Sequence, residues 1–323
     1  RTHDNGVTNF HFEVAADLLN EAELAEIAAM REGLVQLEIG VQSTNLQTIE
    51  AIDRTMNLEK LKKVVASVHS AGNVHQHLDL IAGLPYENLE RFEQSLNYVY
   101  NMQPDQLQIG FLKVLKGSKM YQNAKEYGIV YTDTAPYEVL YTKWISYADV
   151  LTLKAVEEMV ELYYNSIQFT HLIPVLQSRF ENPFAMYDKL ADFYHEKGYF
   201  VHTPARAYRY QVLLEFAQQE DPDGMELYRE LAVYDLYLRE NIKSRPAFLR
   251  DESPWKTLRR EFFQGEEKEP KYLKGYEGYD SRQMAKMAHL EVFGDGRVVV
   301  FDYKNRDPLT YNAKAFLIAA NPA

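Results

Sequence analysis

The chain of 323 residues exceeds the usual size of one hydrophobic core, and 46% of its residues are hydrophobic, so we expect two structural units. Its formal net charge of −12 argues against nucleic acid as the main partner, because phosphate backbones are bound by clusters of Lys and Arg. The sequence has neither an apolar run of about 18 residues nor a basic-then-apolar signal pattern, so we expect no membrane span, no export and a cytoplasmic location.

The chain contains no cysteine, which excludes disulfides, thiol nucleophiles and a cysteine-ligated cluster within this chain. It begins with Arg1 rather than Met and enters a strand-like stretch almost at once, from Asn9 to Val14. We therefore expect a fragment of a larger fold. Most of the 24 Tyr and 16 Phe residues follow Tyr121, which indicates a second domain.

Residues 1–118 alternate short apolar runs with amphipathic stretches, as the β-α units of a parallel sheet do. The expected strands are 9–14, 35–42, 74–81 and 106–114. The expected helices are 21–32, 46–54, 58–71 and 89–102. Connections of this length form right-handed crossovers, so successive strands curl the same way. We predict an α/β domain that forms part of a parallel (β/α) barrel, similar to a TIM barrel.

Residues 119–323 predict a mainly helical second domain. The expected amphipathic helices are 151–165, 182–197, 204–219 and 225–241. A polar stretch from Gln264 to Gly278 indicates a long loop. Beyond it, apolar and polar residues alternate on both sides of Gly294-Asp-Gly296, a pattern that predicts a short terminal β-hairpin.

Three of the predicted strands each turn polar side chains to one face, because side chains alternate across a strand. Glu13, Gln42 and Asp79 lie at the C-terminal ends of these strands, where parallel α/β folds bind their ligands. Each residue alone could instead cap a turn or anchor a loop. Their coincidence favours a binding site.

Three histidines share these polar faces and leave a second possibility open. His11, His75 and His77 project from neighbouring strands, as zinc or iron ligands do. The H-x-H pair stands before the strand end, which favours histidines that shape a substrate cavity or hydrogen-bond one another over a metal site.

Two sequence blocks carry a resemblance to a known superfamily. Glu38-Ile-Gly-Val-Gln-Ser43 and Leu78-Asp-Leu-Ile-Ala-Gly-Leu-Pro85, with Arg54 between them, resemble the second half of a radical S-adenosylmethionine (SAM) domain. The pattern is most similar to the cobalamin-dependent and coproporphyrinogen-dehydrogenase-like branches. The likeness covers roughly the first third of the chain.

The resemblance implies a binding surface for SAM. Gln42 and Asp79 would hydrogen-bond the ribose hydroxyls, and Arg54 would bind the methionine carboxylate. Glu13 would help to hold the methionine amino group. An arginine at the end of a helix can also complement the helix dipole without any ligand, but the flanking blocks favour the carboxylate role.

The resemblance places the adenine beside the backbone of Gly110, Phe111 and Leu112. It also implies parts that this chain lacks. Radical SAM enzymes hold a 4Fe-4S cluster through a C-x3-C-x2-C motif that follows the first barrel strand, and no such motif is present. We expect the N-terminal half of the barrel, the cluster and a cobalamin-binding domain in the intact protein only.

We therefore predict a fragment of a radical SAM oxidoreductase or transferase that is inactive by itself. In the intact protein, reductive cleavage of SAM would be followed by hydrogen abstraction or methyl transfer on a small-molecule or unknown substrate. Two alternatives stay open: a non-catalytic interaction or scaffold unit, and a metal-dependent barrel hydrolase.

Overall fold

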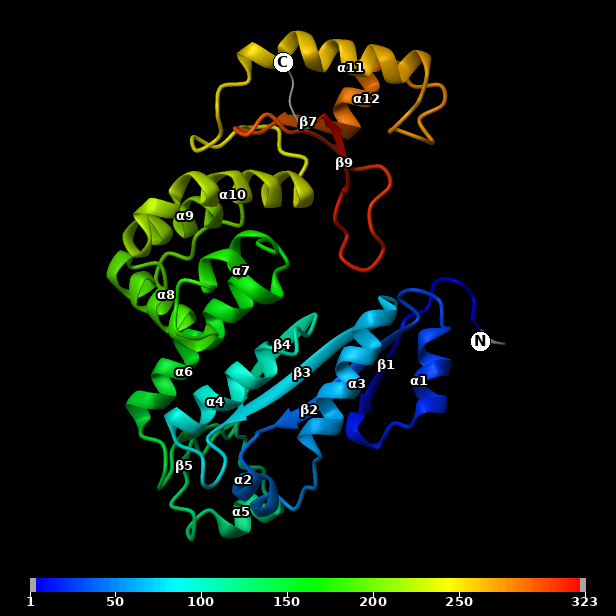
Figure 1. The fold of residues 1–323 in the computed structure, drawn as a ribbon. Helices are drawn as coiled ribbons and strands as arrows, with labels where there is room; N and C mark the ends of the chain where they lie inside the picture. Colours follow the sequence, from blue (N-terminus) through cyan, green and yellow to red (C-terminus); the bar gives the residue numbers. More distant parts are fainter. Residues whose placement is uncertain (1–3, 320–323) are drawn as a thin grey trace. The chain divides into compact units, whose positions relative to one another are not determined.

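The structure is a computed structural model that describes residues 4–319 and forms two compact units (Figure 1). Unit 1 runs to Ser166 and also includes Phe180–Phe200. Unit 2 consists of Ile167–Arg179 and the chain from Val201 onward. In the part of the chain that the structure describes, no helix is long and apolar enough to cross a membrane.

Unit 1 is built on four parallel strands in the order β1-β2-β3-β4. They are β1 Phe10–Val14, β2 Val35–Gln42, β3 His75–Ala82 and β4 Gln106–Phe111. On the polar face of the sheet, paired residues form two rows, one of Glu13, Glu38 and His77, the other of Gly40, Asp79 and Gln108. This parallel sheet, the helical region and the terminal hairpin confirm the predicted fold class.

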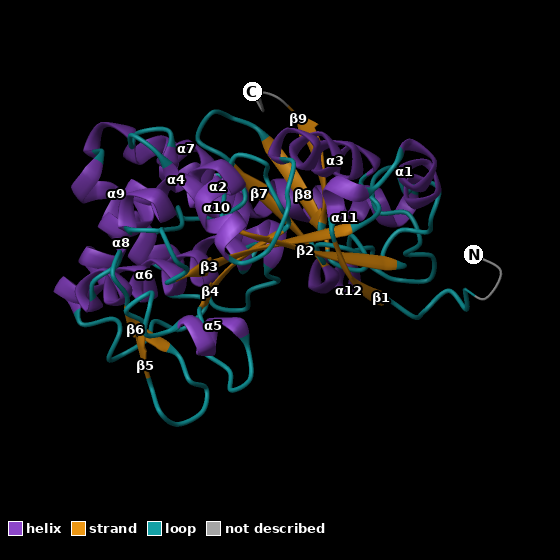
Figure 2. Ribbon diagram, turned by 90° about the horizontal axis from the view of Figure 1, so that it is seen from below, coloured by secondary structure: helices purple, strands orange, loops and turns teal. Residues whose placement is uncertain are grey.

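Helices cover one face of the parallel sheet. The connecting helices α1 Glu21–Ala28, α3 Leu58–Ala71 and α4 Leu89–Tyr100 all lie on that face (Figure 1, Figure 2), as right-handed crossovers require. The residues buried beneath them are apolar: Val35, Leu37, Ile39, Val41, Leu78, Leu80, Leu107 and Ile109. The polar side chains of the opposite face are partly buried on β2 and β3 and exposed at His11, Glu13 and Gln108.

A second group of helices completes unit 1. Helix α6 Tyr147–Val160 continues as a π-helical turn, η2 Glu161–Asn165, and α8 Pro183–Lys197 packs against α6 and α4. Asn165 closes the edge of β4, because its side chain accepts from the amide N of Leu107 and donates to the carbonyl O of the same residue, both at 2.9 Å. Unit 1 therefore extends past residue 118, where we predicted the domain boundary.

Shorter elements connect these parts of unit 1. They are η1 Ala16–Leu18, α2 Leu46–Ala51, α5 Lys119–Asn123 and the antiparallel pair β5 Val130–Tyr131 and β6 Val139–Tyr141. Helix α5 and this pair lie near each other in both views (Figure 1, Figure 2).

Unit 2 combines helices with an antiparallel sheet. Its helices are α7 Leu172–Gln177, α9 Arg209–Glu220, η3 Pro222–Gly224, α10 Met225–Arg239, η4 Ser253–Trp255, α11 Lys256–Lys268 and α12 Ser281–Met287. Its strands are β7 Ala288–Val292, β8 Val298–Asp302 and β9 Lys314–Ala319, in the order β7-β8-β9. The predicted hairpin is β7 and β8, and β9 adds a strand that the sequence pattern did not reveal.

Two local predictions in unit 2 were wrong. The helix expected from residue 204 begins at Arg209, because Ala205–Tyr208 form a separate turn closed by the bond from Tyr208 N to Ala205 O. The expected loop from Gln264 is helical as far as Lys268. This end of α11 is polar but not a free loop, because Glu266 is buried and accepts hydrogen bonds from the backbone N–H groups that follow it.

Candidate functional site

The end of β2 brings two predicted site residues together. Gln42 has a left-handed backbone with φ of 67°, and the pairing of β2 with β3 shifts between Gly40 and Gln42. A Cβ atom on Gly40 would stand 2.5 Å from Nε2 of Gln42 and 3.4 Å from Nη1 of Arg54. Because Gly40 has no side chain, the ends of the Gln42 and Arg54 side chains can both lie above this point of the strand. A strained backbone of this kind is typical of ligand sites.

The prediction that helix α2 extends to Arg54 is wrong, because the helix ends at Ala51. The chain turns through Asp53, with φ of 54°, and the amide N of Arg54 donates to the carbonyl O of Ile49. Within residues 4–319, the partly buried guanidinium of Arg54 has neither a hydrogen bond nor an ion pair. An unpaired guanidinium in this setting is free to bind a carboxylate.

Asp79 pairs with Gly40 across β2 and β3 and also has unused hydrogen-bonding capacity. Its Oδ1 atom lies 3.2 Å from Nε2 of His77, but the geometry is not that of a hydrogen bond, and both buried atoms lack such a partner in the described chain. Burial raises the pKa of Asp79, the charge of His77 opposes this, and Glu38 and Glu13 raise the pKa further. The carboxyl group can therefore accept from a ligand.

The row beside Asp79 is acidic. Glu13 pairs with Glu38, which in turn accepts from Nδ1 of His11 at 3.3 Å. Both glutamates act electrostatically on Asp79, so three carboxyl groups share one negative field. Such a field suits a cationic ligand group, for example an ammonium or a sulfonium.

Phe111 is placed differently from the other predicted site residues. It follows Leu107 and Ile109 on the apolar face of β4, and its ring lies 4.1 Å from Nζ of Lys154. The Phe111 side chain therefore points away from Gln42 and Asp79. The predicted contact of the neighbouring backbone with adenine stays a prediction.

Sequence reasoning missed a buried carboxyl group, Glu87, beside the site. Its side chain is in a residue only 1% exposed, and Oε1 accepts from Ser43 Oγ at 2.6 Å and from Ser95 Oγ at 3.1 Å. Oε2 has no hydrogen-bond partner among the described residues. Burial raises the pKa of Glu87 to about 7, although both hydroxyls lower it.

The same region joins the two sequence blocks. Beside the bond between Ser43 and Glu87, the Thr48 hydroxyl donates to the carbonyl of Pro85, and the Asn45 amide donates to that of Tyr86, both at 2.8 Å. The turn after β2 is thus fastened to the loop after β3. In the sequence, Ser43 ends the first block and Glu87 lies two residues after the second. These positions beside the two blocks were the signal that could have identified Glu87 as part of the site.

The metal alternative rested on His11, His75 and His77, which the structure does not gather. His11 contacts Glu38, His77 contacts Asp79, and His75 pairs with Gln36 along the strands. Over residues 4–319, no three His, Cys, Asp or Glu side chains are arranged to hold a metal ion.

One family model and several curated relatives are similar to parts of this chain. A family model described as "Protein of unknown function (DUF4080)" matches residues 125–307, more than half of the chain. Over 107 residues, or 31% of its length, the chain is 29% identical to the oxygen-independent coproporphyrinogen III oxidase of Salmonella typhimurium. Over 115 residues, or 35% of its length, it is 28% identical to the oxygen-independent coproporphyrinogen-III oxidase-like protein HemZ of Bacillus subtilis.

These matches cover 23% of the Salmonella enzyme and 22% of HemZ, so the chain spans less than a quarter of these relatives. Among solved structures, coproporphyrinogen III oxidase (HemN) from Escherichia coli, described as a radical SAM enzyme, is 19% identical with a TM-score of 0.38. That superposition covers 54% of this chain and 39% of HemN, and a similarity of this size adds nothing to the fold described above.

Proposed function

The chain belongs to the DUF4080 family, whose model matches residues 125–307. For the first third of the chain, which precedes this match, we propose that it binds S-adenosylmethionine as part of a radical SAM enzyme. The similarity to oxygen-independent coproporphyrinogen III oxidases confirms the resemblance to the radical SAM superfamily, whereas the likeness to the cobalamin-dependent branch stays a prediction. The observation that carries the proposal is the meeting of Gln42 and Arg54 above Gly40, next to the unpartnered carboxyl oxygen of Asp79.

The chemistry of these side chains fits the cofactor. The guanidinium of Arg54 matches the methionine carboxylate, and the side-chain oxygens of Asp79 and Gln42 can accept from ribose hydroxyls. The negative field of Glu13 and Glu38 favours the ammonium and sulfonium groups. When bound, SAM supplies a sulfonium group whose reductive cleavage starts radical chemistry.

The residues of this chain bind and orient the cofactor in this proposal. Ser43 and Glu87 hold the turn that carries Gln42, and Gly40 leaves room above β2. The chain has no cysteine, so it offers no thiolate to an iron–sulfur cluster, and we assign no step to a cluster here. A cobalamin-binding domain, the subsequent reaction and the substrate of the intact protein remain predictions.

Binding of SAM to the 323-residue chain, measured by isothermal titration calorimetry, tests the proposal. We expect Gln42→Ala, Arg54→Gln and Asp79→Ala each to weaken binding about tenfold or more, because each removes a hydrogen bond to a polar or charged ligand group. Gln36→Ala is the matched control, since Gln36 lies on the same face of β2 at its opposite end. It should bind SAM like the parent chain.

Absence of measurable SAM binding by the folded chain would contradict the proposal. So would three site variants that bind like the Gln36→Ala control. Either result would favour the alternative of a non-catalytic interaction or scaffold unit.

A further inference from the structure

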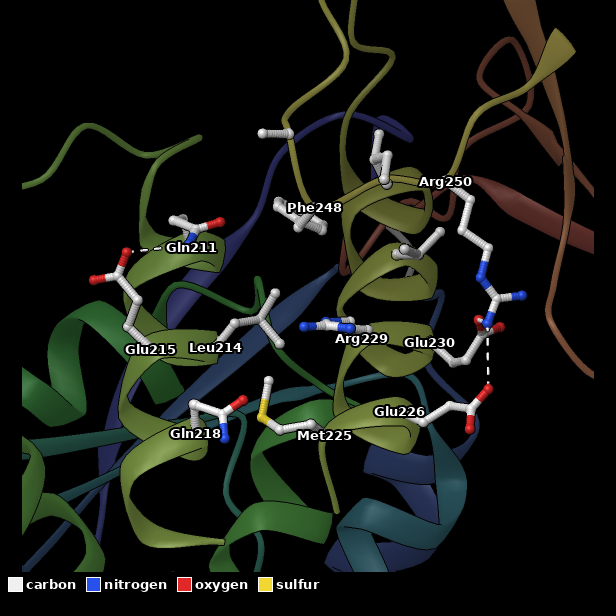
Figure 3. Close-up of a pocket in the computed structure, with 13 residues that line it drawn as sticks. Gln211, Leu214, Glu215, Gln218, Met225, Glu226, Arg229, Glu230, Phe248 and Arg250 are labelled. Atoms are coloured by element: carbon white, nitrogen blue, oxygen red, sulfur yellow. Dashed lines mark hydrogen bonds and ion pairs between the residues drawn. The ribbon is translucent and has the colours of Figure 1, made fainter. Parts of the chain in front are cut away.

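Unit 2 contains a groove that the SAM proposal does not use. It has a volume of about 860 Å³ and lies between α9, α10 and the segment Ala247–Arg250 (Figure 3). Its apolar lining consists of Leu214, Met225, Val233, Ala247, Phe248 and Leu249. The other seven lining residues are polar or charged, so the groove offers a small molecule both an apolar and a polar surface.

One cation faces this apolar lining. Arg229 projects from α10 toward α9 (Figure 3). Among residues 4–319, its guanidinium has no hydrogen bond and no ion pair, although the chain as a whole carries a net charge of −12. Arg229 is an exposed arginine that no carboxylate of the described residues neutralises, and it lies beside the apolar residues of the groove.

The acidic residues of the groove are turned away from Arg229. Glu215 lies on the far side of α9, where it accepts from the side chain of Gln211 at 3.0 Å (Figure 3). Glu226 and Glu230 lie on the other side of α10, where both contact Arg250, at 3.5 and 2.8 Å. Arg250 is neutralised by these contacts, so Arg229 is the charge available to a ligand.

From this arrangement we propose that the groove binds a small amphipathic carboxylate. The carboxylate pairs with the guanidinium of Arg229, whose planar fork of donors matches its two oxygens. The apolar body lies along Leu214, Val233 and Phe248. Three glutamates and two arginines line the groove, so its net charge is negative even though the glutamates are turned away from Arg229; this favours a monoanion over a phosphate dianion, because the negative charge opposes a second charge on the ligand.

Fluorescence titration of the 323-residue chain with dansyl-labelled undecanoic acid tests this proposal, with the methyl ester of the probe and dodecyl phosphate as comparisons. The acid should bind more tightly than both. Arg229→Gln should weaken binding of the acid about tenfold and leave binding of the ester unchanged. Arg260→Gln is the charge control, because Arg260 is an exposed arginine on α11 outside the groove.

A second pair of variants tests the groove itself. Gln218→Trp places a bulky side chain in the groove from an exposed position and should abolish binding of both acid and ester. Gln219→Trp, at the exposed neighbouring position outside the groove, should leave binding intact. The proposal is wrong if Arg229→Gln binds the acid normally, if Gln218→Trp still binds both probes, or if dodecyl phosphate binds better than the acid.

Discussion

The two larger sheets, one in each unit, differ in how far their polar side chains are hydrogen-bonded by the chain itself. At the parallel sheet of unit 1, among the described residues, Asp79 has a carboxyl oxygen without a hydrogen-bond partner, and Arg54 in the turn after α2 has no ion pair. On the antiparallel sheet of unit 2, Asp302 is only 1% exposed but accepts from Tyr276, from the amide N of Lys304 and from Asn305. The polar groups of unit 1 have hydrogen-bonding capacity left for a ligand, whereas Asp302 in unit 2 is hydrogen-bonded by other residues of the chain.

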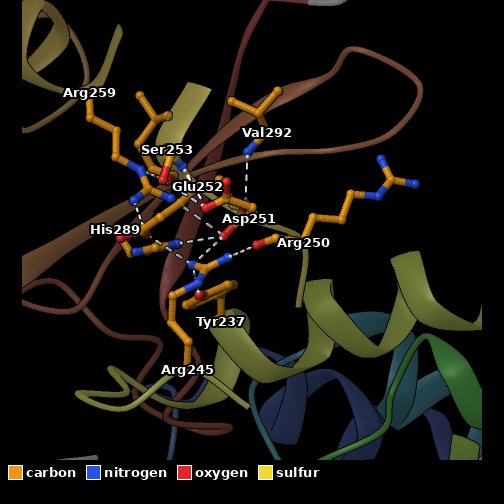
Figure 4. A network of polar contacts seen from close by, with 11 residues as sticks. Tyr237, Arg245, Arg250, Asp251, Glu252, Ser253, Arg259, His289 and Val292 are labelled. Atoms are coloured by element: carbon orange, nitrogen blue, oxygen red, sulfur yellow. Dashed lines mark hydrogen bonds and ion pairs between the residues drawn. The ribbon is translucent and has the colours of Figure 1, made fainter. Parts of the chain in front are cut away.

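Glu291 on β7 shows the second pattern most fully. It is contacted by His289 at 3.0 Å, Arg245 at 3.2 Å and Arg259 at 3.7 Å, and Figure 4 shows these three partners around one network. Burial alone would raise the pKa of Glu291, but the bond from His289 and the charges of both arginines lower it. One atom, Nη2 of Arg259, is left without a hydrogen bond.

The comparison teaches how to separate structural from functional polar residues in this fold. Burial does not distinguish them, because both sheets bury charged groups. The use of hydrogen-bonding capacity, here called saturation, does distinguish them. A polar group whose hydrogen bonds and ion pairs are all made within the chain contributes to stability, whereas a group with unused capacity is available to a ligand. Each of the following predictions tests this distinction.

The largest expected effect is on the saturated network. Glu291→Ala should lower the free energy of unfolding by about 3–4 kcal/mol, because it removes a carboxylate that is only 5% exposed and leaves the partly buried Arg245 and Arg259 with Glu252 alone. Asp79→Asn should change it by less than about 1 kcal/mol, because burial already disfavours the charged form of Asp79. Urea denaturation monitored by circular dichroism measures both.

Glu226→Ala serves as the control, because Glu226 is 87% exposed and pairs with Arg250 at the surface. It should cost less than about 1 kcal/mol. If Asp79→Asn destabilised the chain as much as Glu291→Ala, saturation would not separate the two sheets.

A pH dependence of stability is the next largest effect, and it comes from Glu87. The pKa of Glu87 is about 7 in the folded chain against a usual value of 4.5, so the folded state binds the proton more tightly. Its contribution to stability is therefore full below about pH 4.5 and is lost as the pH rises through 7, a change of about 3 kcal/mol. Glu87→Gln should remove this part of the dependence.

Denaturation curves between pH 5 and pH 8 for the parent chain and for Glu87→Gln isolate this contribution. Glu90→Gln is the control, because Glu90 lies three residues after Glu87 and is exposed in the first turn of helix α4. Equal pH dependence in the parent chain and Glu87→Gln would mean that Glu87 is ionised in the folded state, like Glu291.

The smallest effect on stability is expected at Gly40. Gly40→Ala places a Cβ atom against the flexible ends of Gln42 and Arg54, which can move, so stability should change by less than about 1 kcal/mol. SAM binding should nevertheless weaken about tenfold, because the two side chains lose their common position. Calorimetric titration with SAM beside a thermal melt checks this, and unchanged binding would remove Gly40 from the site.

Much of unit 1 could be predicted because its signals are local. The apolar alternation of Val35 to Val41 and of Leu78 to Ala82 is visible in the sequence, and it predicted both strands and their polar faces. Asn57 and Asn88 cap helices α3 and α4 within three residues of the bonds they make. The placement of Gln42 and Asp79 near a strand end followed from the same periodicity.

Other features depend on partners far away in the chain. Glu87 hydrogen-bonds Ser43, which lies 44 residues earlier, and apart from their positions next to the two sequence blocks no local pattern shows this contact. Strand β9 was not predicted, because its pairing with β8 is a tertiary contact. The end of α11 was predicted to be a loop, because its charged residues gave no sign that Glu266 is buried.

The sequence by itself determined the parallel β-α order, the polar strand faces and the resemblance carried by the two blocks, since all three depend on periodicity or on short motifs. Only the tertiary structure decided that the side chains of Gln42 and Arg54 both lie above Gly40, that the side chain of Phe111 points to the other face, and that Arg229 has no ion pair within residues 4–319. The physical reason is that backbone turns and ion pairing depend on neighbours brought together by folding, which the spacing of residues does not encode.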